Sequence, residues 1–228
     1  MVTLVILYAM LVRLFCGSHR KVYAVYLFWV KLTHFTLNIK MEVEGDVPSE
    51  PGIIMANHRS YFDVAIVRSL NPCVFVAKSS VRSWPIIGFG ADAMRTVWVN
   101  RKSKESRQKT RTQLKQRLEE GLSVILFPEG TTTIGPDIAP YKPGMFFTVA
   151  EGGFNLYAVA IEYEGPGIAW VDKDLFVPHF FKIFGKKEIR VKVAFSQAMR
   201  NADGEILKEE VESWTQKKVF DFRRQWDS

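Results

Sequence analysis

Hydrophobic and polar residues alternate over residues 36–44, with an apolar side chain at every second position from Leu37 to Val43. A period of two predicts a strand that buries one face. Two shorter runs, residues 53–56 and 122–127, are almost entirely apolar, which predicts strands buried on both faces. Further strands are predicted over residues 74–77, 96–99, 156–163 and 188–195.

Helical patterns fall between several of these strands. Helices are predicted from about Ser60 onward, over residues 102–120 and over residues 208–224. Ser60 and Asp63 have the spacing of a capping box, in which the first residue caps the helix N-terminus. Because strands alternate with helices, we expect an α/β fold with a mainly parallel central sheet flanked by helices.

The first 35 residues form a strongly apolar region. Two apolar runs, residues 2–16 and 22–35, are joined by the polar residues 17–21. Neither run offers the roughly 20 nearly uncharged residues that a membrane-spanning helix needs, because Arg13 interrupts the first run and Lys31 the second. A secretory signal is also disfavoured, since the first run has neither a basic start nor a small-residue cleavage site.

Two structures remain for this region. It is either a helical hairpin in the membrane interface, with its basic side chains reaching head groups, or a pair of helices buried in the core. We favour the hairpin, because a soluble domain rarely begins with so dense an apolar stretch. The predicted organisation is therefore membrane-associating helices over residues 1–35 and an α/β domain over residues 36–228.

The net charge of +7 arises from one segment. Residues 101–117 hold eight basic side chains and one acidic side chain, so the rest of the chain sums to zero. A neutral body with one basic segment favours a local anionic partner, such as a phosphate, a lipid head group or an acidic carrier protein. Nucleic acid is disfavoured as a partner, because the segment lacks interleaved aromatic residues.

The two cysteines, Cys16 and Cys73, are far apart and show no metal-binding spacing. The sequence therefore predicts neither a disulfide scaffold nor a cysteine-based metal site, and it is typical of a reducing compartment. We expect no metal ion and no other cofactor.

A first cluster of chemically reactive side chains, Asn57 to Asp63, follows the predicted strand 53–56. Ligand crevices in open α/β sheets form at such strand ends. His58 and Asp63 can meet only if the histidine lies in the turn and the aspartate in the first helical turn. Asp63 would then orient the imidazole as a general base. The alternative is that Asp63 only caps the helix and that His58 is a surface loop residue.

A second cluster, Phe127 to Thr133, begins as the second apolar run ends. Because parallel strands end at the same edge of a sheet, we expect His58 and Glu129 to face one crevice. Gly130 would let backbone N–H groups approach a ligand closely, and the three threonines that follow would offer hydroxyl groups. The alternative is an ordinary Pro-Gly turn with one solvated glutamate.

The two clusters together resemble the 1-acylglycerol-3-phosphate acyltransferase (lysophosphatidic acid acyltransferase) family of glycerophospholipid acyltransferases. The family motif N-H-x-x-x-x-D matches Asn57, His58 and Asp63, and the motif F-P-E-G-T-R-S matches residues 127–131. Similar residues elsewhere extend the resemblance over about residues 50–165; these are Lys78, Pro85, Gly88, Asn100, Arg101 and Lys142 to Gly144.

The resemblance implies an enzyme of phospholipid biosynthesis. It would transfer an acyl chain from an acyl thioester, either acyl-CoA or acyl-carrier protein, to the hydroxyl of a lysolipid at an anionic membrane surface. The location implied is the cytoplasmic face of the inner or plasma membrane. By the family pattern His58 is the general base and Asp63 orients it. The residues assigned to the acceptor are Lys78 and Arg101, which bind its head group, and Glu129, Gly130 and Thr131, which shape its site.

The chain departs from the family motif at Thr132, where the family usually has arginine. Threonine cannot form the bidentate phosphate contact that arginine forms, and related acyltransferases with F-P-E-G-T-T act on other lysolipids, such as lyso-ornithine lipid. Lys78 and Arg101 remain available to a phosphate, so lysophosphatidic acid is the first acceptor that we expect and lyso-ornithine lipid is the alternative. A non-catalytic lipid-binding protein on the same fold is a second alternative.

Overall fold

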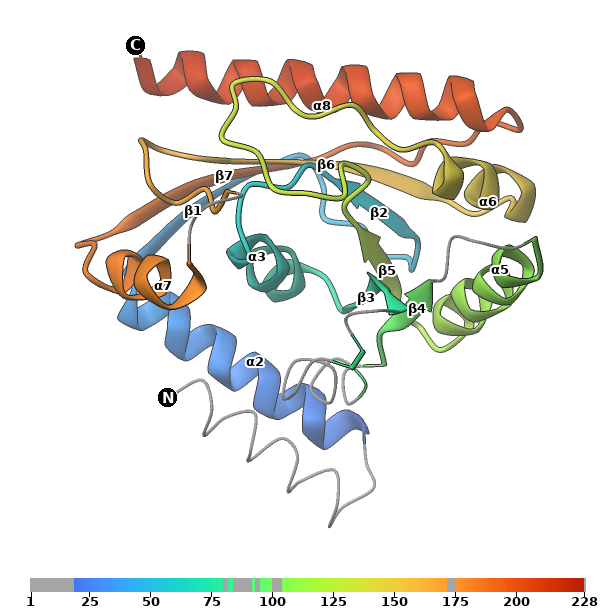
Figure 1. Ribbon diagram of the computed structural model, residues 1–228, viewed down its shortest axis with the longest axis horizontal. Helices are drawn as coiled ribbons and strands as arrows, with labels where there is room; N and C mark the ends of the chain where they lie inside the picture. The colour runs from blue at the N-terminus through green and yellow to red at the C-terminus, as the bar shows by residue number, and fades with distance from the viewer. Residues whose placement is uncertain are drawn as a thin grey trace.

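The computed structural model describes residues 19–79, 82–83, 92, 95–99, 104–171 and 175–227. Within these residues, seven strands form one sheet with helices on both faces, which confirms the predicted α/β class (Figure 1). Several features predicted from sequence lie outside the described residues. They are the apolar run 2–16, the loop around Pro85 and Gly88, and Arg101.

The strands are β1 (Ile39–Glu44), β2 (Ile53–Ala56), β3 (Cys73–Lys78), β4 (Val97–Val99), β5 (Ser123–Leu126), β6 (Leu156–Tyr163) and β7 (Ile189–Phe195). Their order across the sheet is β1-β7-β6-β2-β5-β3-β4. From β6 to β4 all neighbours run parallel. β7 runs antiparallel to β6, and β1 runs parallel to β7. The sheet is therefore mainly parallel, with a reversed pair at one edge.

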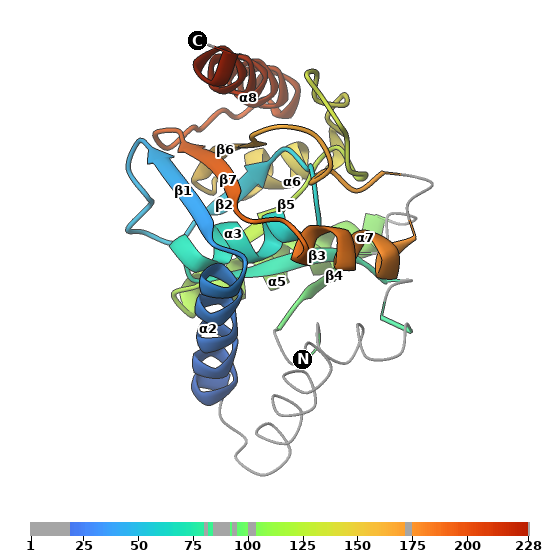
Figure 2. The ribbon, with the colours of Figure 1, turned by 90° about the vertical axis from the view of Figure 1, so that its left-hand side faces the viewer.

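The helices are α2 (His19–Thr36), α3 (Phe62–Leu70), α5 (Lys104–Glu119), α6 (Gly144–Gly152), α7 (Phe176–Phe184) and α8 (Gly204–Asp227). α5, α6 and α8 cover one face of the sheet, and α2, α3 and α7 lie on the other (Figures 1 and 2). The buried strand β2 serves both cores: Ile53 and Met55 point to the α8 side, and Ile54 and Ala56 to the α3 side.

Helix α3 begins differently from the sequence prediction. Its N-cap residue is Tyr61 rather than Ser60, and no side-chain hydroxyl caps it. The buried Ser60 hydroxyl has no hydrogen-bond partner among the described residues. Instead the Asp63 carboxylate accepts a hydrogen bond from the Ser60 backbone N–H at 2.9 Å. A charged acceptor forms a stronger hydrogen bond than a hydroxyl. Of the two hydrogen bonds of a capping box, only the one from the Ser60 backbone N–H to the Asp63 carboxylate therefore forms.

Two helices were not predicted from sequence, and proline obscures the start of both. Pro143 and Gly144 are typical of a turn, yet Pro143 is the N-cap residue of α6. Pro178 lies in the first turn of α7, where its missing N–H costs no intrahelical hydrogen bond.

Helix α2 corresponds to the second of the two N-terminal apolar runs. Its inward face buries Val30 and Thr33, whereas Phe28 and Phe35 are 69% and 84% exposed. None of the described helices combines the length and the apolar character needed to cross a bilayer. Residues 19–21, predicted as part of a polar hinge, already belong to α2.

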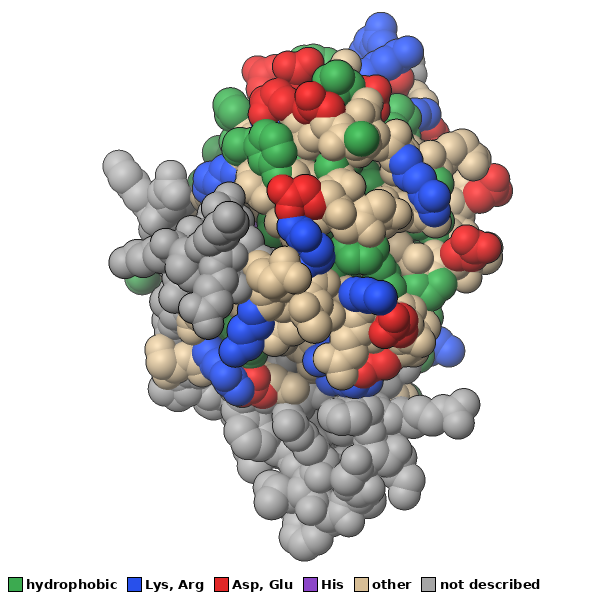
Figure 3. All heavy atoms as spheres, turned by 90° about the vertical axis from the view of Figure 1, so that its right-hand side faces the viewer, with side chains coloured by type: hydrophobic (Ala, Val, Ile, Leu, Met, Phe, Trp, Pro, Cys, Tyr) green, Lys and Arg blue, Asp and Glu red, His purple; other side chains and the backbone are tan. Residues whose placement is uncertain are grey.

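The basic segment forms helix α5 from Lys104 onward, and Leu114 on the inward face of this helix is completely buried. Part of its charge is paired within the fold, because Arg111 forms an ion pair with Glu151 and Arg117 pairs with Glu120. Figure 3, which faces the α5 and α6 side of the molecule, shows basic side chains interleaved with acidic ones. A docking surface for an anionic partner on α5 therefore stays a prediction, with fewer exposed charges than the sequence count implies.

Candidate active site

The two sequence motifs meet where β2 and β5 end. These strands are parallel neighbours, so the loops that follow them leave the same edge of the sheet. The backbone N–H of His58 donates a hydrogen bond of 2.6 Å to Glu129 Oε1. Both residues thus lie at one edge of the sheet, as expected, and the contact between them is direct, but Glu129 is buried between the loops instead of facing an open crevice.

His58 and Asp63 form the central pair of this site. The distance from His58 Nδ1 to Asp63 Oδ2 is 2.7 Å. The carboxylate accepts the Nδ1 proton, which leaves Nε2 of the neutral ring as the basic nitrogen. The ring stacks on Phe127, with centroids 4.0 Å apart, and its side chain is 19% exposed. No described residue forms a hydrogen bond with Nε2, so none of them competes with a substrate hydroxyl for this nitrogen.

Asp63 is fully buried and is held by four donors. Oδ2 also accepts the backbone N–H groups of Arg59, at 2.7 Å, and Ser60. Oδ1 accepts the hydroxyl of Tyr163 at 2.8 Å. A buried carboxylate is tolerated only when such donors replace water, so this arrangement fixes the orientation of the Asp63 side chain.

Glu129 joins the two motif loops instead of facing solvent. Besides the His58 N–H, its carboxylate accepts the backbone N–H of Ala139 at 2.7 Å and the hydroxyl of Thr133 at 3.1 Å. The residue is 2% exposed. Burial raises the pKa of Glu129, and the two backbone donors partly oppose this shift. In this structure Glu129 therefore links the two loops. It can shape the acceptor site only indirectly, by holding these loops in place.

Gly130 and Thr131 lie on the exposed surface of the second loop. Gly130 has a φ of 72°, and a Cβ atom there would lie 2.3 Å from the ammonium nitrogen of Lys142. The loop backbone and a basic side chain thus meet at the point where the sequence predicts a close approach to a ligand. Lys78 is the last residue of β3, and the structure describes only its backbone.

We expect Gly130→Ala to lower activity more than it lowers stability. The positive φ costs roughly 1–2 kcal/mol for alanine, and the methyl group displaces the Lys142 ammonium group. We expect kcat/KM to fall about tenfold, below the ~100-fold loss that a misplaced site can cause. Gly153→Ala is the control, because Gly153 also has a positive φ, of 63°, but no atom within 4 Å of the added carbon. Equal activity of the two variants would show that the close approach of Lys142 to Gly130 has no role in activity.

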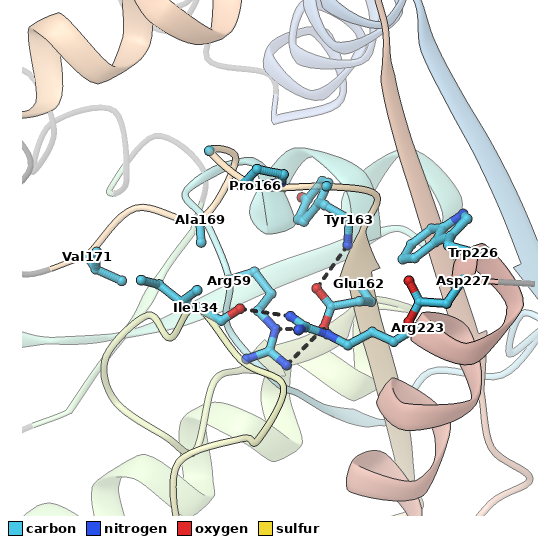
Figure 4. Close-up of a pocket in the computed structure, with 12 residues that line it drawn as sticks. Arg59, Ile134, Glu162, Tyr163, Pro166, Ala169, Val171, Arg223, Trp226 and Asp227 are labelled. Atoms are coloured by element: carbon cyan, nitrogen blue, oxygen red, sulfur yellow. Dashed lines mark hydrogen bonds and ion pairs between the residues drawn. The ribbon is translucent and has the colours of Figure 1, made fainter.

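A buried ion pair joins the first motif to the end of β6 (Figure 4). Arg59 Nη2 lies 2.9 Å from Glu162 Oε2, and the two side chains are 1% and 3% exposed. The Arg59 Nη1 group donates to the Thr133 hydroxyl at 2.6 Å, and Arg223 Nε donates to Glu162 at 3.2 Å. Arg59, Glu162 and Arg223 line a pocket of about 620 Å³ together with residues of the loop 165–171.

Sequence reasoning assigned no role to Glu162, Tyr163 or Arg223, and it noted Arg59 only as a member of the first motif. One signal was present: Glu162 is the only charged residue in a strand that is otherwise apolar except for tyrosine. A charged residue in a fully buried strand requires a partner. The sequence does not say which of the chain's 31 arginines and lysines provides it.

Asn57 extends the pairing of β2 with β6 through its side chain. Its Nδ2 group donates to the Ile161 carbonyl at 2.8 Å, and its Oδ1 accepts the Ile161 N–H at 2.7 Å. Thr132 also bonds away from the site, since its hydroxyl donates to the carbonyl of Trp170. In this structure the residue that replaces the family arginine therefore holds a neighbouring loop.

Comparisons with known proteins show the family to which this chain belongs. The family model described as Acyltransferase matches residues 38–162. A lyso-ornithine lipid O-acyltransferase from Pseudomonas aeruginosa is 31% identical over 61% of this chain, and the chain spans only about half of that enzyme, 54%. A 1-acyl-sn-glycerol-3-phosphate acyltransferase from Neisseria gonorrhoeae is 28% identical over 77% of this chain and 73% of its own length.

A solved structure shares the fold. The crystal structure of the 1-acyl-sn-glycerophosphate (LPA) acyltransferase PlsC from Thermotoga maritima aligns with a TM-score of 0.67. The alignment covers 95% of this chain and 87% of that chain, at 17% sequence identity. At this identity the likeness shows a common architecture, and the site must be judged from its own residues.

Proposed function

This chain belongs to the acyltransferase family, and from that premise we propose that it transfers an acyl chain from an acyl thioester to the free hydroxyl of 1-acyl-sn-glycerol 3-phosphate. The observation that carries the proposal is the His58–Asp63 pair. Nδ1 is held at 2.7 Å by a buried carboxylate, the His58 side chain is 19% exposed, and Nε2 has no partner among the described residues. This arrangement suits a general base.

The proposed reaction needs no nucleophile from the protein. Nε2 of His58 removes the proton from the acceptor hydroxyl as its oxygen attacks the thioester carbonyl. A tetrahedral oxyanion forms, and backbone N–H groups of the motif loops would stabilise it. The C–S bond then breaks, the new ester C–O bond remains, and the imidazolium returns its proton to the leaving thiolate. Asp63 stabilises the imidazolium between these two proton transfers.

We further propose that the protein works at an anionic membrane surface on the cytoplasmic side. Helix α2 supports this proposal, because Phe28, Lys31 and Phe35 are exposed on one side while Val30 and Thr33 are buried. Aromatic side chains with a neighbouring lysine suit the boundary between head groups and acyl chains. The donor would be acyl-CoA or acyl-carrier protein.

Lyso-ornithine lipid is the second candidate acceptor, and Thr132 is the observation that favours it. The hydroxyl of Thr132 bonds to the Trp170 carbonyl, so this position supplies no cation to a phosphate. A lyso-ornithine head group carries an ammonium and a carboxylate instead of a phosphate, and it does not require an arginine there. The Pseudomonas relative is named for this acceptor.

An acceptor panel tests the proposal. Purified protein would be incubated with a labelled acyl thioester and either lysophosphatidic acid, lyso-ornithine lipid or glycerol 3-phosphate. We expect kcat/KM for lysophosphatidic acid to exceed that for lyso-ornithine lipid by about tenfold or more, since one charged hydrogen bond to the phosphate is worth roughly 1.5–3 kcal/mol. Glycerol 3-phosphate keeps the phosphate but lacks the acyl chain, so we expect its lower kcat/KM to reflect the lost burial of apolar surface. A higher value for lyso-ornithine lipid would establish the second acceptor. Binding of lysolipid without transfer to any acceptor would instead indicate a non-catalytic lipid-binding protein.

A further inference from the structure

Three consecutive residues at the end of β6 each contact one residue of the first motif. The pairs are Ile161 with Asn57, Glu162 with Arg59, and Tyr163 with Asp63. Because successive strand residues point to opposite faces of a sheet, the motif is held from both faces at once. Among these three, only Tyr163 contacts a member of the His58–Asp63 pair through its side chain.

The Tyr163 hydroxyl bonds to the Asp63 oxygen that does not face His58. It is the only described side chain or backbone group that donates to Oδ1, whereas Oδ2 accepts His58 Nδ1 and two backbone N–H groups. Tyr163 is itself 6% exposed. Burial and the neighbouring Asp63 charge raise the pKa of Tyr163 well above its ordinary value, so the hydroxyl stays protonated and continues to donate.

Removal of this hydroxyl would leave Oδ1 buried without a donor. An unpaired carboxylate oxygen in a dry site is costly, and the carboxylate can reduce that cost by turning so that its two oxygens share the remaining donors. Such a turn would move Oδ2 away from His58 Nδ1. The orientation of the imidazole therefore depends on a group that does not contact it.

We propose that Tyr163 is a positioning residue, which fixes the Asp63 carboxylate so that Oδ2 holds His58 Nδ1 and Nε2 faces the acceptor. The effect on catalysis rests on the acyl transfer proposed above. The effect on the hydrogen bond between His58 and Asp63 does not depend on it.

The test compares Tyr163→Phe with Tyr157→Phe in the full chain. Both changes remove one hydroxyl from the same strand and the same apolar core, but Tyr157 contacts neither motif through a hydrogen bond in the structure. The first readout is the proton resonance of the His58 Nδ1–H group, which a strong hydrogen bond to a carboxylate displaces downfield. We expect Tyr163→Phe to move it upfield or to lose it by exchange with water, and Tyr157→Phe to leave it in place.

The second readout is acyl transfer under saturating substrates. We expect Tyr163→Phe to lower kcat by roughly 10- to 100-fold, as a misplaced catalytic group does, with KM for both substrates nearly unchanged. Tyr157→Phe should retain the wild-type kcat. A Tyr163→Phe protein with the wild-type resonance would overturn the proposal, whatever its activity. An altered resonance in a protein whose wild type transfers no acyl group would support the positioning and refute the proposed function.

A double variant covers the case in which Tyr163→Phe folds but is too unstable for the His58 resonance to be recorded. In the Asp63→Asn background the charged acceptor is gone, so adding Tyr163→Phe should lower the melting temperature much less than it does in the wild-type background. An equal fall in both backgrounds would show that the hydroxyl does not act through Asp63, and this result too would overturn the proposal.

Discussion

The rate of acyl transfer by the His58→Ala variant should be about 10³-fold lower than that of the wild type, within the range of roughly 10²–10⁴ that a general base contributes. Within the His58–Asp63 pair, Nε2 is the nitrogen that can take the proton of the acceptor hydroxyl, because Nδ1 is bonded to Asp63. The reduction should appear in kcat, since the imidazole acts on the reacting atoms and contributes little to holding the lysolipid. Initial rates with a labelled acyl thioester measure it.

Two controls separate lost chemistry from lost structure. His34→Ala removes an imidazole from α2, outside both motifs, and should leave kcat within a factor of two. Added imidazole should restore part of the activity of His58→Ala, because the truncated side chain leaves space beside Asp63. Turnover of His58→Ala within tenfold of the wild type would contradict the proposed mechanism, and it would also favour the lipid-binding alternative if transfer by the wild type were negligible.

The largest expected loss of stability follows from Arg59→Leu. This change leaves the Glu162 carboxylate buried with only the partly exposed Arg223 as a charged partner. Breaking a buried pair on one side costs about 3–5 kcal/mol, and we expect the lower end of this range because Arg223 remains. The free energy of unfolding, from urea titrations followed by circular dichroism, measures the effect.

Arg190→Leu is the matched control. Arg190 is 52% exposed and pairs with Glu164 and Glu188 at the surface, so its loss should cost about 0–1 kcal/mol. Replacing Glu162 with leucine in the Arg59→Leu background should regain part of the stability, since it removes the uncompensated buried charge. If Arg59→Leu and Arg190→Leu had the same unfolding midpoint, the buried Arg59–Glu162 pair would not stabilise the fold more than a surface ion pair does.

The fold was predictable where the hydrophobic pattern is unambiguous. β2 and β6 have the predicted bounds, Ile53–Ala56 and Leu156–Tyr163, because an apolar run of about four to eight residues between turn signals is typical of a buried strand and is too short for most helices. The meeting of His58 with Glu129 was predictable for the same reason: two parallel strands end at one edge.

The support of the site was not predictable, because it depends on long-range pairing. Arg59 and Glu162 are separated by 103 positions, and no local pattern links them. The sequence pattern also leaves the direction of a strand open, so the reversal of β1 and β7 could not be seen. The start of α3 was misjudged at Ser60, since spacing alone cannot show whether a hydroxyl or a carboxylate will take the free backbone N–H groups.

The contacts between residues 161–163 and the first motif bear on how this site can be transplanted. A chimera that takes only the N-H-x-x-x-x-D segment from a relative would pair the relative's motif with residues 161–163 of this chain. A chimera that also takes the F-P-E-G segment would have the same mismatch. The structural unit of this site is therefore three segments, 57–63, 127–133 and 161–163, which have to be exchanged together if the imported histidine–aspartate pair is to keep its supporting contacts.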